Sequence, residues 1–373
     1  MNAIDFYKKQ FFNNHHDREL SAEKLHFNNA GLAPISLWAK DKINYWSERF
    51  YREGFFTDAD YMEEVAKTRD SLAKLFGGNA SNIAFFQNAS NAISQVVFQF
   101  PWNAGDEILA FDCDYSSVVY PLLEVSKRFS CSLTLVPSTR FHPDLDQLLS
   151  AIKPQTKMIV LSWVQFQSGT ILSLEQLSQI CREKNIFLLV DAMQGLGLHP
   201  LDLKKLSIDA LVGGSHKWLV SPVGLGFLHL DSKWHGKLKL HNVGSGSYGT
   251  CDDPMSLECI PKLDASKFES GAKQVLEITA LGASVDLILQ TGVEAIESEV
   301  LKLSHKLHQG LIALNYDTQY FGSSIVTFVP RPETEKALKG IACVYAKRGI
   351  GIRLSPHAFN TDREIDKILS ALS

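Results

Sequence analysis

Three scarcities in the sequence exclude several classes of protein. The chain of 373 residues holds six cysteines, none in a C-x-x-C pair, so we expect reduced thiols rather than a disulfide framework or a structural zinc site. No apolar run approaches the roughly 18 residues that a membrane-spanning helix needs. The segment from Met1 to Leu20 lacks the apolar core of a signal peptide. We therefore expect a cytoplasmic protein without a membrane partner.

The chain also lacks a large excess of charge of either sign. Its 37 basic and 41 acidic residues give a formal net charge of −4, so nothing favours nucleic acid as a main partner. Hydrophobic residues make up 45% of the chain, which is enough apolar side chain to offset the ordering entropy of a packed core. At roughly 150 residues per domain, the length indicates two domains.

Short apolar runs alternate with longer amphipathic segments in the first two thirds of the chain. The runs lack the alternation of a half-exposed strand, so they are typical of strands buried on both faces. The predicted strands are residues 83–86, 108–111, 133–136, 158–161, 186–190, 210–212 and 226–230, and the predicted helices include residues 91–100, a stretch that ends at 129, and 174–184. This order predicts an α/β fold with a mostly parallel sheet flanked by helices.

The pattern changes after about residue 256. The last third is predicted to contain helices at 275–290, at 293–314 and from 362, one further helix, and strands at 324–329 and 349–354. We therefore predict a large α/β domain at residues 21–255 and a smaller α+β domain at residues 256–373. Residues 1–20 are expected to pack with the smaller domain.

Two polar segments follow buried strands, where an open α/β sheet places its ligands. Asp191 ends one strand, and Lys217 follows another within the segment Gly213–Trp218. Singly, Asp191 is equally typical of a helix N-cap, and Lys217 of a surface lysine. Together, at two strand ends of one sheet, they indicate a pyridoxal phosphate site. That cofactor needs a lysine for a Schiff base and an acid opposite its ring nitrogen.

Five segments resemble the class V aminotransferase family of fold-type I pyridoxal phosphate enzymes. That family includes cysteine desulfurases, kynureninases and isopenicillin-N-epimerase-like proteins. The D-A-x-Q-G motif at Asp191 and the S-H-K-W motif at Ser215 are the most specific. The five segments are residues 26–31, 191–195, 215–218, 268–271 and 353–355. The resemblance covers almost the whole chain and implies the large and small domains of that fold, and a homodimer.

The resemblance implies a role for each matching residue around the cofactor. Lys217 would be the Schiff-base lysine, Asp191 would pair with the ring nitrogen, and Gln194 would lie against the phenolic oxygen. Ser215 and His216 would help to hold the phosphate. No metal ligand is implied.

The turn at residues 87–91 follows a strand and opens a helix, and N–H groups at a helix N-terminus favour an anion. Relatives carry a Thr-Thr type of phosphate cup here, whereas this chain has Ala89 followed by Ser90. We expect the Ala89 N–H and the Ser90 hydroxyl to contact the phosphate. Plain helix capping by Asn88 or Ser90 is the alternative.

Three further positions complete the predicted site. Tyr115 stands where desulfurases stack a histidine on the cofactor ring, and an aromatic side chain serves the same purpose; packing on a helix face is the alternative. Gln165 is expected to reach the cofactor oxygen. Arg353 would clamp the substrate α-carboxylate, because a guanidinium fork suits bidentate binding. Asn29 and Ala30 would line the same pocket.

Two departures from the family pattern bear on function. Cysteine desulfurases carry a loop with a nucleophilic cysteine before the substrate arginine, but here Gly351 and Arg353 are only two residues apart, which argues against that chemistry. Relatives also have a threonine that reaches the neighbouring subunit's phosphate, where this chain has Ser270, Gly271 and Ala272. The segment 244–249 is either a loop over the site or a plain surface loop.

These observations predict an enzyme that acts on a small amino acid through Lys217. Transamination with a keto acid is the family default, and an epimerase or lyase reaction is the alternative. A cofactor-binding relative without turnover is disfavoured by the intact Asp191, Lys217 and Arg353. An unrelated nucleotide-binding α/β enzyme is disfavoured because no G-x-x-x-x-G-K-[ST] motif occurs.

Overall fold

A seven-stranded sheet forms the centre of the computed structural model, which describes residues 2–11, 24–54, 58–249, 259–349 and 351–373. The strand order is β2-β8-β7-β6-β5-β3-β4. The strands are β2 (Ile83–Phe86), β3 (Glu107–Phe111), β4 (Ser132–Val136), β5 (Thr156–Ser162), β6 (Phe187–Asp191), β7 (Ala210–Gly214) and β8 (Gly226–Leu230). Only β8 runs antiparallel to its neighbours β2 and β7, because a short connection joins it to β7.

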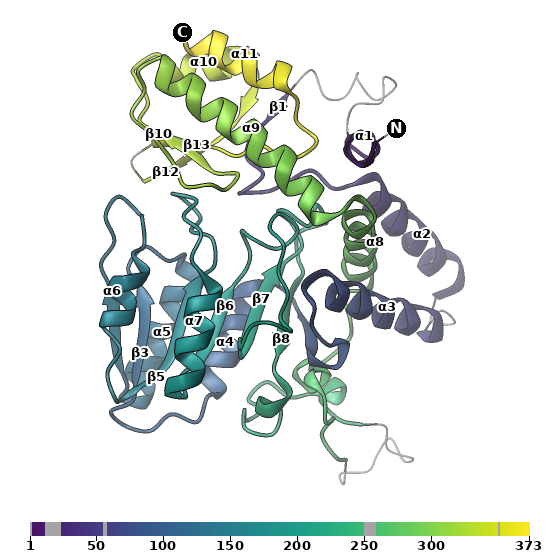
Figure 1. Ribbon diagram of the computed structural model, residues 1–373. Coiled ribbons are helices and arrows are strands. Elements are labelled where there is room, and N and C mark those ends of the chain that lie inside the picture. Colours follow the sequence, from purple (N-terminus) through teal and green to yellow (C-terminus); the bar gives the residue numbers. More distant parts are fainter. Residues whose placement is uncertain (1, 12–23, 55–57, 250–258, 350) are drawn as a thin grey trace.

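Helices cover both faces of this sheet (Figure 1). Successive side chains of each strand point to opposite faces, so Phe187 and Leu189 join a core under α4 (Ala89–Gln99) and α5 (Ser116–Phe129). Leu188 and Val190 join the core on the other face. That second core includes residues of α3 (Asp58–Phe76), α6 (Leu145–Ser150), α7 (Leu174–Lys184) and α8 (Val275–Thr291). The predicted α/β fold with a mostly parallel sheet is confirmed.

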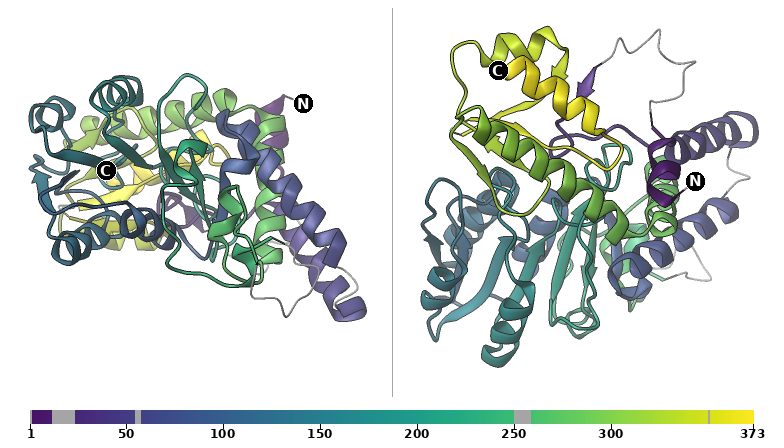
Figure 2. Two further views of the ribbon diagram at one scale, coloured as in Figure 1. Left: turned by 90° about the horizontal axis from the view of Figure 1, so that it is seen from below. Right: turned by 45° about the horizontal axis from the view of Figure 1, so that its top comes forward.

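A four-stranded antiparallel sheet lies above the carboxyl-terminal edge of the large sheet (Figures 1 and 2). Its order is β12-β13-β10-β9. The elements of this part are β9 (Thr318–Tyr320), β10 (Val326–Phe328), β12 (Ala346–Arg348), β13 (Gly351–Leu354), α9 (Val293–Ala313), α10 (Thr334–Gly340) and α11 (Asp362–Leu372). A short parallel pair, β1 (Leu25–His26) and β11 (Cys343–Val344), ties the N-terminal region to this part.

The N-terminal helices bridge the two parts. Helix α1 (Ala3–Lys8) lies against α8 and α9, where Lys8 forms an ion pair of 2.6 Å with Glu299. Helices α2 (Leu37–Glu53) and α3 pack on α8. The predicted boundary between residues 255 and 256 lies outside the described residues. Helix α8, which was expected in the smaller domain, shares its contacts with helices of the N-terminal half.

Two further expectations can be compared with the described part of the chain. No single helix there is both long and apolar enough to cross a membrane. Helices α8 and α9 would meet both conditions only as a pair, and a bend of 82° separates them. Cys113, Cys131, Cys181 and Cys343 are buried free thiols. Cys259 is disulfide-bonded, so the expectation of reduced thiols throughout is wrong at this position.

Candidate active site

The carboxyl ends of β3, β5 and β6 bring two buried carboxylates together. Asp114 Oδ1 accepts the Ser162 N–H at 2.9 Å, and the Trp163 N–H donates to the Asp191 backbone carbonyl at 2.9 Å. Burial, opposed by the bonds from Ser162, raises the pKa of Asp114 to about 6, and the nearby Asp191 charge acts in the same direction as burial. Asp114 is not among the residues that the sequence predicts for the site.

Among the described residues Asp191 forms no ion pair that would compensate its burial. Its Oδ1 accepts the Met193 N–H at 2.9 Å. Burial raises its pKa, while the Met193 bond and the Lys217 charge lower it. A buried carboxylate that is not neutralised by an ion pair is costly to keep charged. Its surroundings therefore favour a further positive or proton-bearing group beside it.

Lys217 lies on the short connection between β7 and β8. The Ser215 hydroxyl shapes this connection, because it lies within hydrogen-bond distance of the carbonyls of Pro222 and Leu225, the latter at 3.1 Å. The lysine Nζ lies 5.8 Å from the centre of the Tyr115 ring. Burial lowers the pKa of Lys217 to about 8, with a further lowering by Arg353 and Arg348 and an opposing effect of Asp191.

Tyr115 forms one wall beside the lysine. It precedes α5 as the N-cap residue without capping through its side chain, and 44% of the residue is exposed. Its ring meets the Phe166 ring edge-on, with centroids 5.1 Å apart. A large aromatic that is left exposed beside the partly buried Lys217 can receive a flat ligand on its free face.

Arg353 enters the same region from β13 of the small sheet. The residue is 1% exposed, yet its partners are neutral: Nη1 donates to the Phe166 carbonyl, and Nη2 donates to Asn28 Oδ1 at 3.3 Å. Its Nε is buried without a hydrogen-bond partner. In the described part of the chain no carboxylate pairs with this guanidinium, so a buried positive charge is left for an anionic ligand.

The segment around Asn29 and Ala30 links the two sheets. Asn29 Nδ2 donates to the Ser355 carbonyl at 2.8 Å, and the Ala30 N–H donates to the Ser355 hydroxyl at 3.0 Å. On its other side, the Ala30 carbonyl accepts Gln194 Nε2 at 2.9 Å. Asn29 Oδ1 is buried without a partner. This segment therefore lies between the Arg353 strand and the Asp191 loop, as expected for a pocket wall.

The N-terminus of α4 offers free donors. Asn88 caps the helix through Oδ1 to the Asn91 N–H at 2.9 Å, whereas no acceptor within the described residues reaches the N–H of Ala89 or Ser90. The Ser90 hydroxyl lies 2.6 Å from that of Ser117 at the start of α5. Gly226 allows this approach, because a Cβ there would lie 2.3 Å from the Asn88 carbonyl carbon.

Three predicted contacts find other partners in the structure. Gln165 accepts the N–H groups of Gln167 and Ser168 at 2.6 Å and donates to the Cys113 carbonyl at 2.8 Å, so its amide holds its own turn. Gln194 Oε1 accepts the Trp218 indole N–H at 2.9 Å. The Ser215 hydroxyl is bound within the lysine loop. Contacts of these three side chains with a cofactor stay predictions.

His216 is partly exposed beside Lys217. Burial, followed by the Lys217 charge, lowers the pKa of His216 to about 4. Its imidazole is therefore neutral near physiological pH, and it would contact a phosphate as a neutral hydrogen-bond donor rather than as a cation. That contact also stays a prediction.

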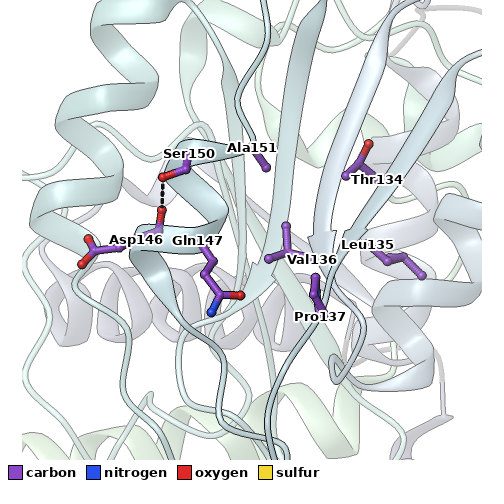
Figure 3. Close-up of a pocket in the computed structure, with 8 residues that line it drawn as sticks. All are labelled: Thr134, Leu135, Val136, Pro137, Asp146, Gln147, Ser150 and Ala151. Carbon is purple, nitrogen blue, oxygen red and sulfur yellow. Dashed lines mark hydrogen bonds between the residues drawn. The ribbon is translucent and has the colours of Figure 1, made fainter.

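Two cavities lie outside this cluster. One, of about 280 Å³, opens beside the α4 N-terminus, and its lining includes Gln87, Ser270, Gly271 and Ala272. The segment 244–249 packs on the same stretch, where the Gly246 N–H donates to the Ser270 carbonyl at 3.1 Å. The other, of about 480 Å³, lies between β4 and α6 and shares no lining residue with the cluster (Figure 3). Its only ionisable lining residue is Asp146.

The cluster fits pyridoxal phosphate by the chemistry of its donors. Asp191 is a buried acid without a strong cation, as a protonated ring nitrogen requires. The free N–H groups of Ala89 and Ser90 suit the phosphate, and Tyr115 offers an exposed ring face. Lys217 supplies an amine of lowered pKa, which favours nucleophilic attachment.

Comparisons with known proteins agree with this reading. The family model for aminotransferase class-V matches residues 43–366. A probable cysteine desulfurase of Mycoplasma genitalium is 26% identical over 289 residues, covering 75% of this chain and 70% of the relative. Isopenicillin N epimerase of Streptomyces clavuligerus is 25% identical over 334 residues, with 82% and 83% covered.

Solved structures show the same fold. The cystine C–S lyase C-DES with its product cysteine persulfide superposes with a TM-score of 0.86 at 22% identity, covering 94% of this chain and 97% of that one. A lysine-to-alanine mutant of C-DES has been solved with glycine covalently linked to its pyridoxal phosphate cofactor. The chain belongs to the class V aminotransferase family of pyridoxal phosphate-dependent enzymes.

Proposed function

We propose that this enzyme removes the Cα proton of a small amino acid and transfers the amino group to a keto acid. The observation that carries the proposal is the position of Lys217. Its pKa is lowered to about 8 by burial, and the charges of Asp191 and Arg353 both act on the amine, in opposite directions. In this proposal Lys217 is the base, Asp191 the acid for the cofactor and Arg353 the carboxylate clamp.

Different residues of the chain would hold different parts of the cofactor. When bound, pyridoxal phosphate supplies an electron sink for the charge that forms at Cα. Asp191 would hold a proton at the ring nitrogen, the N–H groups of Ala89 and Ser90 would bind the phosphate, and the Tyr115 ring would cover one face. Water would be restricted by the contact of Phe166 with Tyr115.

Lys217 is the proton carrier. Its Nζ accepts the Cα proton when neutral and returns a proton when charged, and a pKa near the working pH makes both states available. Arg353 binds the substrate α-carboxylate. The Phe166 carbonyl and Asn28 Oδ1 hold the guanidinium in place, which fixes the substrate's orientation before proton removal.

A second candidate is elimination or epimerisation at the same Cα, supported by relatives named as a lyase and an epimerase. A thiol-based desulfurase is disfavoured. Gly351 and Arg353 lie in one continuous strand, and Cys343 is buried in β11 with its pKa raised to about 12 by burial. A buried thiol of this kind is a poor nucleophile.

The first test concerns Lys217 itself. The purified enzyme is expected to carry the visible absorption band of the bound cofactor, and Lys217→Ala should abolish the band and lower turnover by at least about 10²–10⁴-fold. Lys205→Ala, at an exposed lysine, serves as the control. Far-ultraviolet circular dichroism should show that the variant keeps its fold. An unchanged band in Lys217→Ala would contradict the assignment.

The second test separates the candidate reactions. Incubation with amino acids in deuterated water should introduce deuterium at Cα of the recovered amino acid for transamination and for epimerisation, because both return a proton to Cα. Transfer of isotopically labelled nitrogen from the amino acid to an added keto acid is expected only for transamination. Release of ammonia with loss of the side chain would establish a lyase, and inversion at Cα without nitrogen transfer would establish an epimerase.

We also propose that the enzyme works as a homodimer. Val243, Ile260 and Leu263 are exposed apolar residues, close in sequence to residues that line the cavity beside the α4 N-terminus. Burial of such side chains would stabilise an interface, and it would place a second subunit next to the phosphate-binding donors. Sedimentation of Leu263→Asp against the unchanged enzyme tests this. A cytoplasmic location stays a prediction.

A further inference from the structure

One face of the small sheet carries a second arginine beside the substrate clamp. Ala346 pairs directly with Arg353 across β12 and β13. Directly paired residues share a face of an antiparallel sheet, and so do residues two apart on one strand. Arg348 therefore lies on the Arg353 face, as its diagonal neighbour. Such diagonal neighbours have Cα atoms about 7–8 Å apart.

This face is the one turned toward the large sheet. Thr327, which pairs with Arg353 from the other side, donates its hydroxyl to the Gln167 carbonyl at 2.6 Å. Gln167 Nε2 in turn donates to the Arg348 carbonyl at 3.3 Å. The end of β12 is thus anchored to the loop after β5, whose Phe166 contacts both Arg353 and Tyr115.

The two arginines are not neutralised by protein groups. The Arg348 side chain is exposed, and its Nη1 donates to the Lys347 carbonyl at 2.8 Å. Within the described ranges neither arginine forms an ion pair. Burial lowers the pKa of both Arg353 and Lys217, and the Arg348 charge lowers both further. Like charges held close on a sheet are unfavourable unless an anion joins them.

We propose that Arg348 binds a second carboxylate, so that the site takes dicarboxylic amino acids or dicarboxylic oxo acids. The inference rests on the proposed function, since it assigns Arg353 to the α-carboxylate and Arg348 to the acid at the far end of the side chain. Arg348 is a specificity-determining residue in this arrangement. The Arg348 side chain is exposed, and the carbonyl to which it donates is neutral, so a flexible carboxylate side chain can reach its charge.

Lys347 provides a matched control on the same strand. It is the next residue and therefore points to the opposite face, where its Nζ forms an ion pair of 2.5 Å with Glu335. Lys347→Gln and Arg348→Gln remove the same charge from the same strand. Only Arg348→Gln removes the charge from the face that carries Arg353.

The binding test uses acids that the enzyme cannot turn over. Calorimetric titration of the cofactor-loaded enzyme with glutarate and with pentanoate compares a dicarboxylate with a monocarboxylate of equal length. We expect glutarate to bind at least about tenfold more tightly, which is the gain of one charge-assisted hydrogen bond. Arg348→Gln should abolish this preference, Arg348→Lys should keep part of it, and Lys347→Gln should keep all of it.

Two results would overturn the proposal: equal affinity for the two acids in the unchanged enzyme, or an unchanged preference in Arg348→Gln. Activity then shows which substrate brings the second carboxylate. Faster Cα exchange of aspartate or glutamate than of alanine indicates the amino donor, and nitrogen transfer from alanine to oxaloacetate in preference to pyruvate indicates the acceptor. A glutarate preference without Cα exchange of any amino acid would reject the proposed function and retain the second anion site.

Discussion

Two buried carboxylates of this protein have opposite surroundings. Glu269, next to the short helix at Ala265–Phe268, forms ion pairs with Arg69, at 2.6 Å, and with Lys273, and it accepts the Phe85 N–H at 2.8 Å. Asp191, at the end of β6, has one backbone N–H as its hydrogen-bond donor. Both residues are about equally buried, at 5% and 6% exposure. The two residues differ in whether neighbouring cations compensate the buried negative charge.

The arginines show the same contrast. Arg69 forms an ion pair with Glu269, whereas the hydrogen bonds of Arg353 to the described residues go to neutral oxygens. Charges that the protein neutralises itself hold elements together, and charges that it leaves open are available to ligands. The uncompensated residues lie where the two sheets face each other: Asp191 and Lys217 at the carboxyl-terminal edge of the large sheet, and Arg353 on the small sheet. This comparison can be tested by removing one charge of each kind.

The largest effect on stability is expected for Glu269→Gln. The amide would leave Arg69 and Lys273 without their counter-charge in a buried place, which costs about 3–5 kcal/mol of the free energy of unfolding. Denaturant unfolding of the apoprotein measures this loss. Glu335→Gln, which breaks an exposed ion pair with Lys347, should leave the unfolding midpoint unchanged. An unchanged midpoint in Glu269→Gln as well would mean that the buried ion pairs of Glu269 stabilise the fold no more than an exposed pair does.

Asp191→Asn should separate function from stability. The neutral amide keeps the shape and relieves a buried charge, so the free energy of unfolding of the apoprotein should stay equal or rise. Turnover should fall by about 10²–10³-fold, as is typical when a preorganised charge at the reacting centre is removed. Steady-state kinetics and unfolding on the same preparation give both numbers. A loss of stability like that of Glu269→Gln would make Asp191 a structural residue.

The smallest effect concerns the pH dependence of Lys217. Its pKa in the fold is about 8, below the ordinary 10.5, because of burial. The unfolded chain therefore binds this proton first as the pH falls from about 10.5 to 8, and the apoprotein loses stability in that window. The loss should be about 1–3 kcal/mol, since the residue is partly exposed.

Lys217→Met isolates this contribution. The variant cannot bind the proton, so the difference in stability from the unchanged apoprotein should grow as the pH falls through the window and level off below about pH 8. Parallel unfolding curves at several pH values measure it. A constant difference across the window would mean that the amine keeps an ordinary pKa in the fold.

Much of the fold could be predicted because its strands are apolar on both faces. Strand β2 at Ile83–Phe86, strand β8 at Gly226–Leu230 and helix α7 at Leu174–Lys184 match the expected bounds. The position of the site could be predicted from the same strands, because the carboxyl ends of parallel strands meet at one edge of the sheet. Asp191 is the last residue of β6, and Lys217 lies three residues after the end of β7.

Features that depend on pairing between distant segments could not be predicted. Arg348 lies on the same face as Arg353 because of the register between β12 and β13, and no residue pattern in the sequence shows that register. Phe166 acts through its backbone carbonyl, which no residue pattern marks. Gln165 fitted the expected position, yet its amide is used by its own turn. Strand order and main-chain contacts decide these roles.

The main chain and the side chain of Phe166 contact different parts of the site. Its main-chain carbonyl holds Arg353, and its ring touches Tyr115 at the pocket wall. The anchor is independent of the side chain, so exchanges at this position would reshape the space for a substrate while the clamp stays in place. New substrate selectivity can therefore evolve at Phe166, because a change of its side chain leaves the arginine that binds the carboxylate in place.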